Sequence, residues 1–282
     1  MNQELVVTKA NKLVEASYRL NVSEQRVLAL LVAQIAPDDE EFKPYSFKVA
    51  DLEALIGTKN NKAYREVKEL TMGLIKKGLQ IQEPNRLVQV SWLSSAVYYD
   101  GAGTVELKFT PELKPYLLKL QERFTSYKIG NLVKLRSRYS VRLYELLKQY
   151  ETLGKRSFDL AELRHVLGLV DGELGRWVDF KRFVLEVAKR ELPQKTDIGF
   201  SYTVRKHVRT VAFVDFKIWH VDHDKPSNKS SKKASKKAGK KKPGSQRQQA
   251  EQCYREHKCG TTCDVQDIAT LNVLPTLARA TV

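Results

Sequence analysis

Cysteine is scarce in this 282-residue chain and confined to one end. Only Cys253, Cys259 and Cys263 occur, all within the last thirty residues. The rest of the chain cannot form a disulfide, as expected of a protein that folds in a reducing cytoplasm.

Long apolar runs are missing as well. The longest, 27–36, has about ten residues and contains Gln34, whereas a membrane-spanning helix needs about 18. The N-terminus, MNQELVVTKA, carries Glu4 and has no basic start before an apolar stretch, so we expect no secretory signal. These features predict a cytoplasmic protein without a membrane partner.

Motifs for catalysis are also lacking. There is no Walker A glycine loop, no GxSxG and no carboxylate cluster spaced as in nucleases. A nicking enzyme would need two metal-binding histidines with one residue between them. His220 and His223 have two residues between them. We therefore expect no catalytic residue, no cofactor and no metal. A nicking or polymerising enzyme is the least favoured alternative, and mutation of both histidines would test it.

Positive charge, in contrast, is abundant. Lys and Arg total 49 against 33 Asp and Glu, a net charge of +16. A protein this basic usually meets a polyanion, most often nucleic acid; an anionic membrane surface is the weaker alternative. Residues 225–282 hold 13 basic and 4 acidic residues, and 1–224 hold 36 and 29. The high charge is therefore partly a property of the tail.

The tail differs from the body in composition. Residues 225–244 contain nine lysines and no acid, so we expect this Lys-rich stretch to be disordered and to add non-specific DNA affinity. Four potential zinc ligands follow: Cys253, His257, Cys259 and Cys263. Their spacing matches no zinc finger or knuckle that we can name. Free thiols are the favoured interpretation, and zinc binding stays open.

The body contains an internal repeat. FKVADLEALIG at 47–57 aligns without a gap with FDLAELRHVLG at 158–168. Each copy has apolar residues at helical spacing and ends on a glycine. Longer amphipathic stretches, 24–35 and 139–150, precede the two copies. Chance similarity of two short helices is the alternative, but these flanks argue against it.

The segments that follow each copy complete the pattern. Predicted helices at 61–77 and 176–192 precede alternating, strand-like stretches at 79–109 and 198–219. Three helices and then a hairpin, twice over, is the order expected of tandem winged helices. In such a fold the third helix enters the DNA major groove, and the hairpin, or wing, lies along the backbone or the minor groove.

The helix at 176–192 is the stronger candidate for reading DNA. We expect Phe180, Phe183, Val184 and Val187 to face the core, and Pro193 to mark the helix end. The opposite face and its flanks carry the candidate DNA-binding residues Arg176, Lys181, Arg182, Lys189 and Arg190, with Asp179 and Glu186 among them. Arg can pair with guanine, although a solvated face with internal ion pairs is the plain alternative.

The wing and the first-half helix supply the other candidates. Arg205, Lys206, His207 and Arg209 gather at the tip of the second hairpin, where they suit phosphate contacts. Charge that only keeps the tip soluble is the alternative. In the first half, Lys59, Lys62, Arg65 and Lys68 lie on or before the outer side of 61–77. Glu66 and Glu69 dilute that charge, so this site ranks second.

A dimer contact could involve three apolar residues near the N-terminus. Leu13, Leu20 and Val27 fall seven apart, as in a short zipper stripe. Asn21 to Ser23 interrupt the stripe, and Ser23 suits the N-cap of the next helix. Core packing is the favoured role of the three residues, with partner contact as the alternative.

Two long stretches resemble the initiator Rep family of iteron plasmids, the theta-type replication initiators. Residues 120–150 carry the pattern RFT…YS-x-RLYELL-x-QY, and residues 178–218 carry DFKR…L…KTDI and the closing hairpin. The likeness extends over about residues 5–220. It implies an α+β chain with two winged-helix domains related by a pseudo-two-fold axis. We place them at 1–125, for dimerisation and DNA backbone contact, and at 126–224, for the main DNA recognition, followed by a disordered tail at 225–282.

The resemblance also implies a function. Members bind double-stranded DNA at directly repeated origin sites (iterons) as monomers, promote origin opening, and recruit host replication initiation and helicase-loading proteins. Their dimers bind an inverted-repeat operator and repress their own gene. By position, Lys181 and Arg182 correspond to the base-reading cluster, Lys195 to a basic residue just after the helix, and Arg209 to the wing. The family often has a third basic residue where this chain has Phe183, and Pro193 predicts an early helix end.

The main rival is a two-winged-helix transcriptional regulator with no role in initiation. An initiator and such a regulator would share a fold and differ in the DNA sites that they bind. An initiator would bind direct repeats beside an A·T-rich stretch, and a regulator would bind one palindrome.

Overall fold

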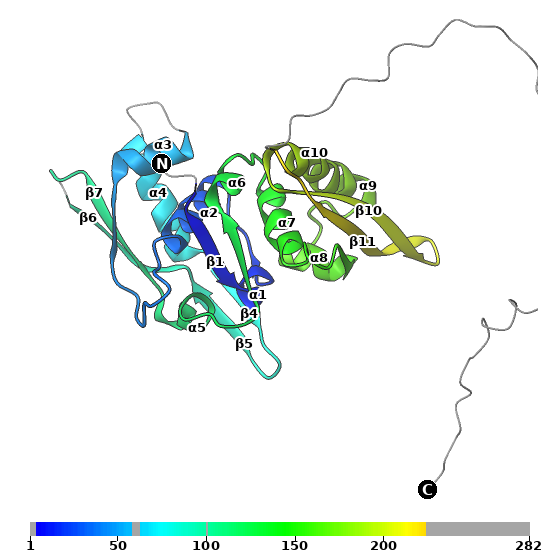
Figure 1. Ribbon diagram of the computed structural model, residues 1–282, viewed down its shortest axis with the longest axis horizontal. Helices are drawn as coiled ribbons and strands as arrows, with labels where there is room; N and C mark the ends of the chain where they lie inside the picture. The colour runs from blue at the N-terminus through cyan, green and yellow to red at the C-terminus, as the bar shows by residue number, and fades with distance from the viewer. Residues whose placement is uncertain (1–3, 58–62, 100, 224–282) are drawn as a thin grey trace, which may run out of the picture. The chain divides into compact units, whose positions relative to one another are not determined.

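One element order occurs twice in the structure, a computed structural model that describes residues 4–57, 63–99 and 101–223 (Figure 1). Each copy has a long helix, a strand, a short helix, a third helix and an antiparallel hairpin. The first copy comprises α2 (Val22–Val32), β3 (Tyr45–Lys48), α3 (Val49–Ile56), α4 (Ala63–Lys76), β4 (Gly78–Gln82) and β5 (Leu87–Ser91). The second comprises α7 (Arg138–Lys148), β9 (Lys155–Asp159), α8 (Leu160–Val166), α9 (Trp177–Phe180), a π-helical segment (Lys181–Leu185), α10 (Glu186–Lys195), β10 (Ile198–His207) and β11 (Thr210–His220). The predicted tandem winged helices are confirmed.

The remaining elements surround the first copy and join it to the second. They are β1 (Val6–Ala10), α1 (Asn11–Val14), β2 (Ser17–Tyr18), β6 (Leu93–Tyr99), β7 (Thr104–Phe109), a 3₁₀ turn (Pro111–Leu113), α5 (Lys114–Leu117), β8 (Phe124–Lys128) and α6 (Ile129–Val133). The strands form four antiparallel sheets, β1-β8, β2-β4-β5, β3-β7-β6 and β10-β11-β9. The proposed boundary between the two domains, after residue 125, falls inside β8. The division of residues 1–224 into domains at this point stays a prediction.

The internal repeat is structural. In both copies an edge strand leads directly into the short helix, and a glycine in the left-handed region follows that helix. Gly57 has φ 80° and Gly168 has φ 67°. A side chain disfavours this conformation, which explains why each helix stops at a glycine.

Capping starts the first long helix two residues before the expected position. Asn21, and not Ser23, is the N-cap of α2: its side chain accepts from the N–H of Glu24, and the Glu24 carboxylate accepts from the N–H of Asn21. Such a reciprocal capping box satisfies two backbone donors at once and outcompetes a single serine cap.

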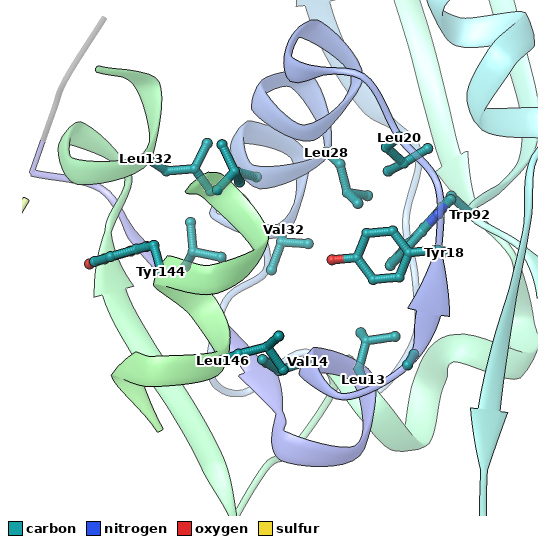
Figure 2. Packing of buried hydrophobic residues seen from close by; sticks show 14 of the residues in the cluster. Leu13, Val14, Tyr18, Leu20, Leu28, Val32, Trp92, Leu132, Tyr144 and Leu146 are labelled. Atoms are coloured by element: carbon teal, nitrogen blue, oxygen red, sulfur yellow. The ribbon is translucent and has the colours of Figure 1, made fainter. Parts of the chain in front are cut away.

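A continuous core joins the N-terminal elements to α6 and α7 (Figure 2). Buried side chains come from α1, α2 and β2 on one side and from α6 and α7 on the other. The three candidate dimer residues belong to this core: Leu13, Leu20 and Val27 are 0%, 2% and 1% exposed. In this fold they pack in the core, which is the role that the sequence favoured. A dimer contact through them stays a prediction that would require this core to open.

A buried charge cluster crosses the same core. The carboxylate of Glu145 in α7 accepts from Lys9 Nζ of β1 at 2.7 Å, from Arg142 Nη1 at 3.0 Å and from the hydroxyl of Tyr18 at 3.1 Å. Tyr127 of β8 also donates to it. Two buried cations therefore share one buried carboxylate. We name Lys9, Tyr18, Tyr127, Arg142 and Glu145 the Glu145 cluster.

Arg142 extends this cluster to backbone on both sides of the core. Its Nη2 donates to the carbonyl oxygens of Val14, Ala16 and Val166, at 2.8, 2.9 and 3.1 Å. Val166 ends α8 of the second winged helix, whereas Val14 and Ala16 lie in the first 20 residues. One guanidinium thus fastens the N-terminal segment to the second winged helix.

The Glu145 cluster predicts an acid-sensitive component of stability. Burial alone would raise the pKa of Glu145, but Lys9 and Arg142 lower it from its ordinary 4.5 to about 2. Because the folded-state pKa lies below the unfolded one, this stabilisation is complete above pH 4.5 and is lost as the pH falls towards 2. Its size is of the order of 3 kcal/mol.

Denaturant unfolding between pH 5 and pH 2.5 would measure this component. The wild type should take up about one more proton on unfolding than Glu145→Gln, which appears as a steeper loss of unfolding free energy with falling pH. Parallel pH curves for the two proteins would contradict the assignment of the effect to Glu145.

Candidate nucleic-acid interface

The third helix of the second winged helix is not a regular α-helix. The π-helical segment Lys181–Leu185 lies between α9 and α10. A π-helical segment adds one residue to a helical turn. The buried side chains of this helix therefore recur at every fourth residue, at Phe180, Val184, Ala188 and Leu192. Phe183 was predicted to face the core but is 47% exposed. The extra residue turns it outward, beside Arg182.

The helix also runs further than predicted. Pro193 lies inside α10, which continues to Lys195. In the last turn of the helix, the missing N–H of proline removes only one backbone hydrogen bond. After it, the N–H and the hydroxyl of Thr196 both donate to the Leu192 carbonyl at 2.9 Å. Lys195, expected just after the helix, is its last residue.

The outward face of this helix carries the predicted basic residues. Arg176, at the N-cap of α9, is engaged by Asp179, whose carboxylate accepts from its Nε at 2.7 Å. This bond lowers the pKa of Asp179. Lys181, Arg182, Lys189 and Arg190 are exposed. Among the described residues these four make no ion pair, which leaves their charges available to an external anion.

Tyr202 ties this helix to the wing strand β10. Its hydroxyl donates to Glu186 Oε1 at 2.6 Å, and Lys189 lies 5.6 Å from its ring centroid. Burial, and then the bond to Glu186, raise the pKa of Tyr202. The hydroxyl therefore stays protonated, and it holds Glu186 beside the basic face.

The wing presents the second group of predicted residues. The β10–β11 hairpin extends beyond the helices (Figure 1). Lys206, His207 and Arg209 are exposed at its tip around Val208, which has φ 56° and is 86% exposed. Arg205 is bound instead: its Nε donates to Asp215 at 2.8 Å and its Nη2 to Ser157 at 3.0 Å. Its main role in this structure is to hold the wing to β9.

The first winged helix presents fewer free charges. In α4, Val67, Leu70 and Leu74 are buried. Arg65 pairs with Glu69 at 3.4 Å on the exposed side. Lys68 lies 4.7 Å and 5.2 Å from the ring centroids of Tyr64 and Tyr98. Lys59 and Lys62 lie outside the described residues.

The candidate metal groups do not assemble in the described part of the chain. His220 Nδ1 lies 2.7 Å from Glu151, and His223 Nε2 donates to the Thr196 carbonyl at 2.8 Å. No group of three or more His, Cys, Asp and Glu placed to hold a metal occurs among residues 4–57, 63–99 and 101–223. The tail group of Cys253, His257, Cys259 and Cys263 lies outside them. In the same ranges, no helix is long and apolar enough to cross a membrane.

A further basic group was missed by sequence reasoning. Arg26, Lys134 and Arg136 line one hollow together with Lys195. Arg26 belongs to α2, Lys134 follows the end of α6, and Arg136 lies in the turn before α7. Arg26 is therefore more than 100 residues from the other two in the sequence. No spacing rule relates such positions, so only the fold could reveal them.

Comparison with known families places both halves of the chain. Residues 6–148 match the family described as "Initiator Replication protein, WH1", and residues 159–218 match "Initiator Rep protein, WH2". Among curated relatives from Escherichia coli, an uncharacterised 27.6 kDa protein is 27% identical over 219 residues, which cover 72% of this chain and 91% of the relative. A second, PI protein, is 25% identical over 265 residues, which cover 80% and 86%.

A solved structure agrees on the fold. The crystal structure of Pi initiator protein in complex with iteron DNA is similar, with a TM-score of 0.63 and 23% identity. The similarity covers 79% of this chain and all of that one. Together with the two family matches, the repeated winged helices show that this chain belongs to the initiator replication protein family.

Proposed function

We propose that this protein is a plasmid replication initiator that binds directly repeated origin sites sequence-specifically. The observation that carries the proposal is the outward face of the second winged helix. It combines four exposed basic side chains without internal ion pairs with a projecting basic wing. This combination suits base reading in the major groove and phosphate contact beside it. The solved Pi initiator protein, of the same fold, is bound to iteron DNA.

The finer parts of the proposal follow from the family resemblance. We infer that the bound monomer promotes origin opening and recruits host replication proteins. We also infer that a dimer represses the protein's own gene through an inverted repeat. The net charge of +16 supports contact with a polyanion but does not select among DNA sites.

A footprint on the DNA that flanks the gene would test the proposal. It should be run near physiological salt with excess non-specific competitor, since salt governs the non-specific component. Evenly spaced protected repeats support initiation. One symmetric footprint at the promoter would leave only the regulator alternative, and no protection on either side would refute sequence-specific binding there.

Arg182→Ala should weaken binding to the protected repeat by about 1–3 kcal/mol and relax specificity at one base position. Arg182 is exposed on the π-helical segment, and its guanidinium lies 5.3 Å from the ring centroid of Phe183. Binding to the repeat and to each single-base variant would be measured by fluorescence anisotropy.

Arg123→Ala is the matched control, because Arg123 is exposed just before β8. It removes the same charge from a position outside the candidate interface and should leave base preference unchanged. An equal loss in both variants, without any change in base preference, would show that Arg182 contributes only charge.

A further inference from the structure

A basic hollow of about 630 Å³ opens where the first winged helix meets the end of α10 in the second winged helix. Its lining is Arg26 of α2, Val133 and Lys134 at the end of α6, Arg136 of the following turn, Gln194 and Lys195 at the end of α10, and His223. Four of these seven residues carry a fixed positive charge, and none carries a carboxylate. We name this feature the interdomain hollow.

Arg26 is held in place but incompletely satisfied. Its Nη2 donates to the Leu135 carbonyl at 3.0 Å and its Nη1 to the Leu55 carbonyl at 3.4 Å. Its Nε is buried and has no hydrogen-bond partner among the described residues. Burial, followed by the nearby charge of Arg136, lowers the pKa of Arg26. The two guanidiniums thus repel each other, and a bound anion would relieve this cost.

A carboxylate next to this group, Glu191, is already engaged by other donors. Glu191 of α10 is 8% exposed and accepts from the backbone N–H of Arg136 at 3.3 Å and of Ser137 at 3.3 Å. It also accepts from Lys195 Nζ at 2.6 Å. These bonds neutralise Lys195 and fix the turn that carries Arg136.

Two cations at the rim remain available. The side chains of Lys134 and Arg136 are exposed, and neither makes an ion pair with a carboxylate of the described residues. A guanidinium N–H without a partner, at Arg26, and two exposed cations without carboxylate partners suit the binding of an oxyanion.

We propose that the interdomain hollow binds a phosphate group through Arg26, Lys134 and Arg136. Two sources share this chemistry: a backbone phosphate of DNA and a free phosphate-bearing molecule. The DNA source rests on the proposed function, because it requires one duplex to contact both winged helices. The phosphate would then be held between the two domains, at a position that carries no base information.

The test uses the full chain and two variants. Lys134→Gln/Arg136→Gln removes both exposed cations from the rim of the hollow. Lys108→Gln is the control, because Lys108 is exposed on β7 and makes no ion pair with described residues. All three side chains are at the surface, so both proteins should fold, and thermal melts would verify this.

The first measurement is calorimetric titration with inorganic pyrophosphate. Wild type and Lys108→Gln should bind one equivalent with equal affinity, and the double variant should bind about tenfold more weakly or worse, since it loses charge-assisted bonds. The second measurement is the affinity for duplex DNA, specific and non-specific, over a range of salt concentrations.

The outcomes separate the two sources. If DNA is the source, the double variant weakens specific and non-specific binding alike, and its log–log salt slope is shallower by about 0.9 for each DNA phosphate that the protein no longer neutralises. Weaker pyrophosphate binding with unchanged DNA binding assigns the hollow to a free phosphate compound. The inference is overturned if both measurements are unchanged, or if Lys108→Gln loses as much as the double variant. A wild type that binds pyrophosphate but protects no origin DNA would refute the proposed function and leave the hollow intact.

Discussion

Gly168→Ala should destabilise the protein by about 3 kcal/mol or more, whereas Gly57→Ala should cost about 1 kcal/mol. The two glycines occupy the same place in the internal repeat, and both have positive φ. A Cβ on Gly57 would meet nothing within 4 Å, but a Cβ on Gly168 would lie 2.1 Å from the carbonyl oxygen of Tyr18. Backbone cannot rotate away as a side chain can, so the fold must shift.

The two glycine variants therefore separate conformational strain from steric exclusion. Gly57→Ala measures only the cost of a side chain in the left-handed region. Gly168→Ala adds a collision with the N-terminal segment that reaches α8. Urea unfolding of both variants would give the difference, and equal losses would show that the second winged helix is not packed on Tyr18 as described.

Glu145→Gln should cost about 3–5 kcal/mol at neutral pH, because it leaves two cations buried without a counter-charge. Lys9 and Arg142 are 3% and 2% exposed, and Glu145 is 1% exposed. A surface pair provides the control: Glu40 and Lys119, with side chains 76% and 54% exposed, make one ion pair. Glu40→Gln should cost at most about 1 kcal/mol.

A second substitution tests the charge balance in the Glu145 cluster. Lys9→Met leaves one cation, Arg142, beside one carboxylate, so it should cost less than Glu145→Gln. Adding Lys9→Met to Glu145→Gln should then recover part of the loss, because one buried charge is removed. Strict additivity of the two changes in unfolding free energy would contradict a shared carboxylate.

Local sequence patterns predicted the internal repeat and most of the helices in it correctly. The helix–glycine unit of the internal repeat and the β10–β11 hairpin are as predicted. Each depends on side-chain period and on the conformational freedom of glycine, which act over fewer than about twelve residues. The exposed basic residues of α9 to β11 could be named for the same reason.

The same pattern failed where the backbone departs from regular geometry. Phe183 faces solvent because a π segment adds a residue that a 3.6-residue period does not include. Pro193 does not end α10, because its place in the last turn costs only one bond. The candidate dimer residues Leu13, Leu20 and Val27 are equally apolar in a core or in an interface, and their spacing cannot distinguish the two.

By itself the sequence determined the tandem winged-helix order, the excess of positive charge and a group of candidate basic residues on one helix and one wing. Only the tertiary structure decided which of those charges are free and which are bound, as Arg205 is by Asp215. It also brought Lys9 to Glu145, 136 residues apart, and assembled the interdomain hollow. The physical reason is that ion pairing and burial depend on distances in space, which chain folding sets between residues that no local period relates.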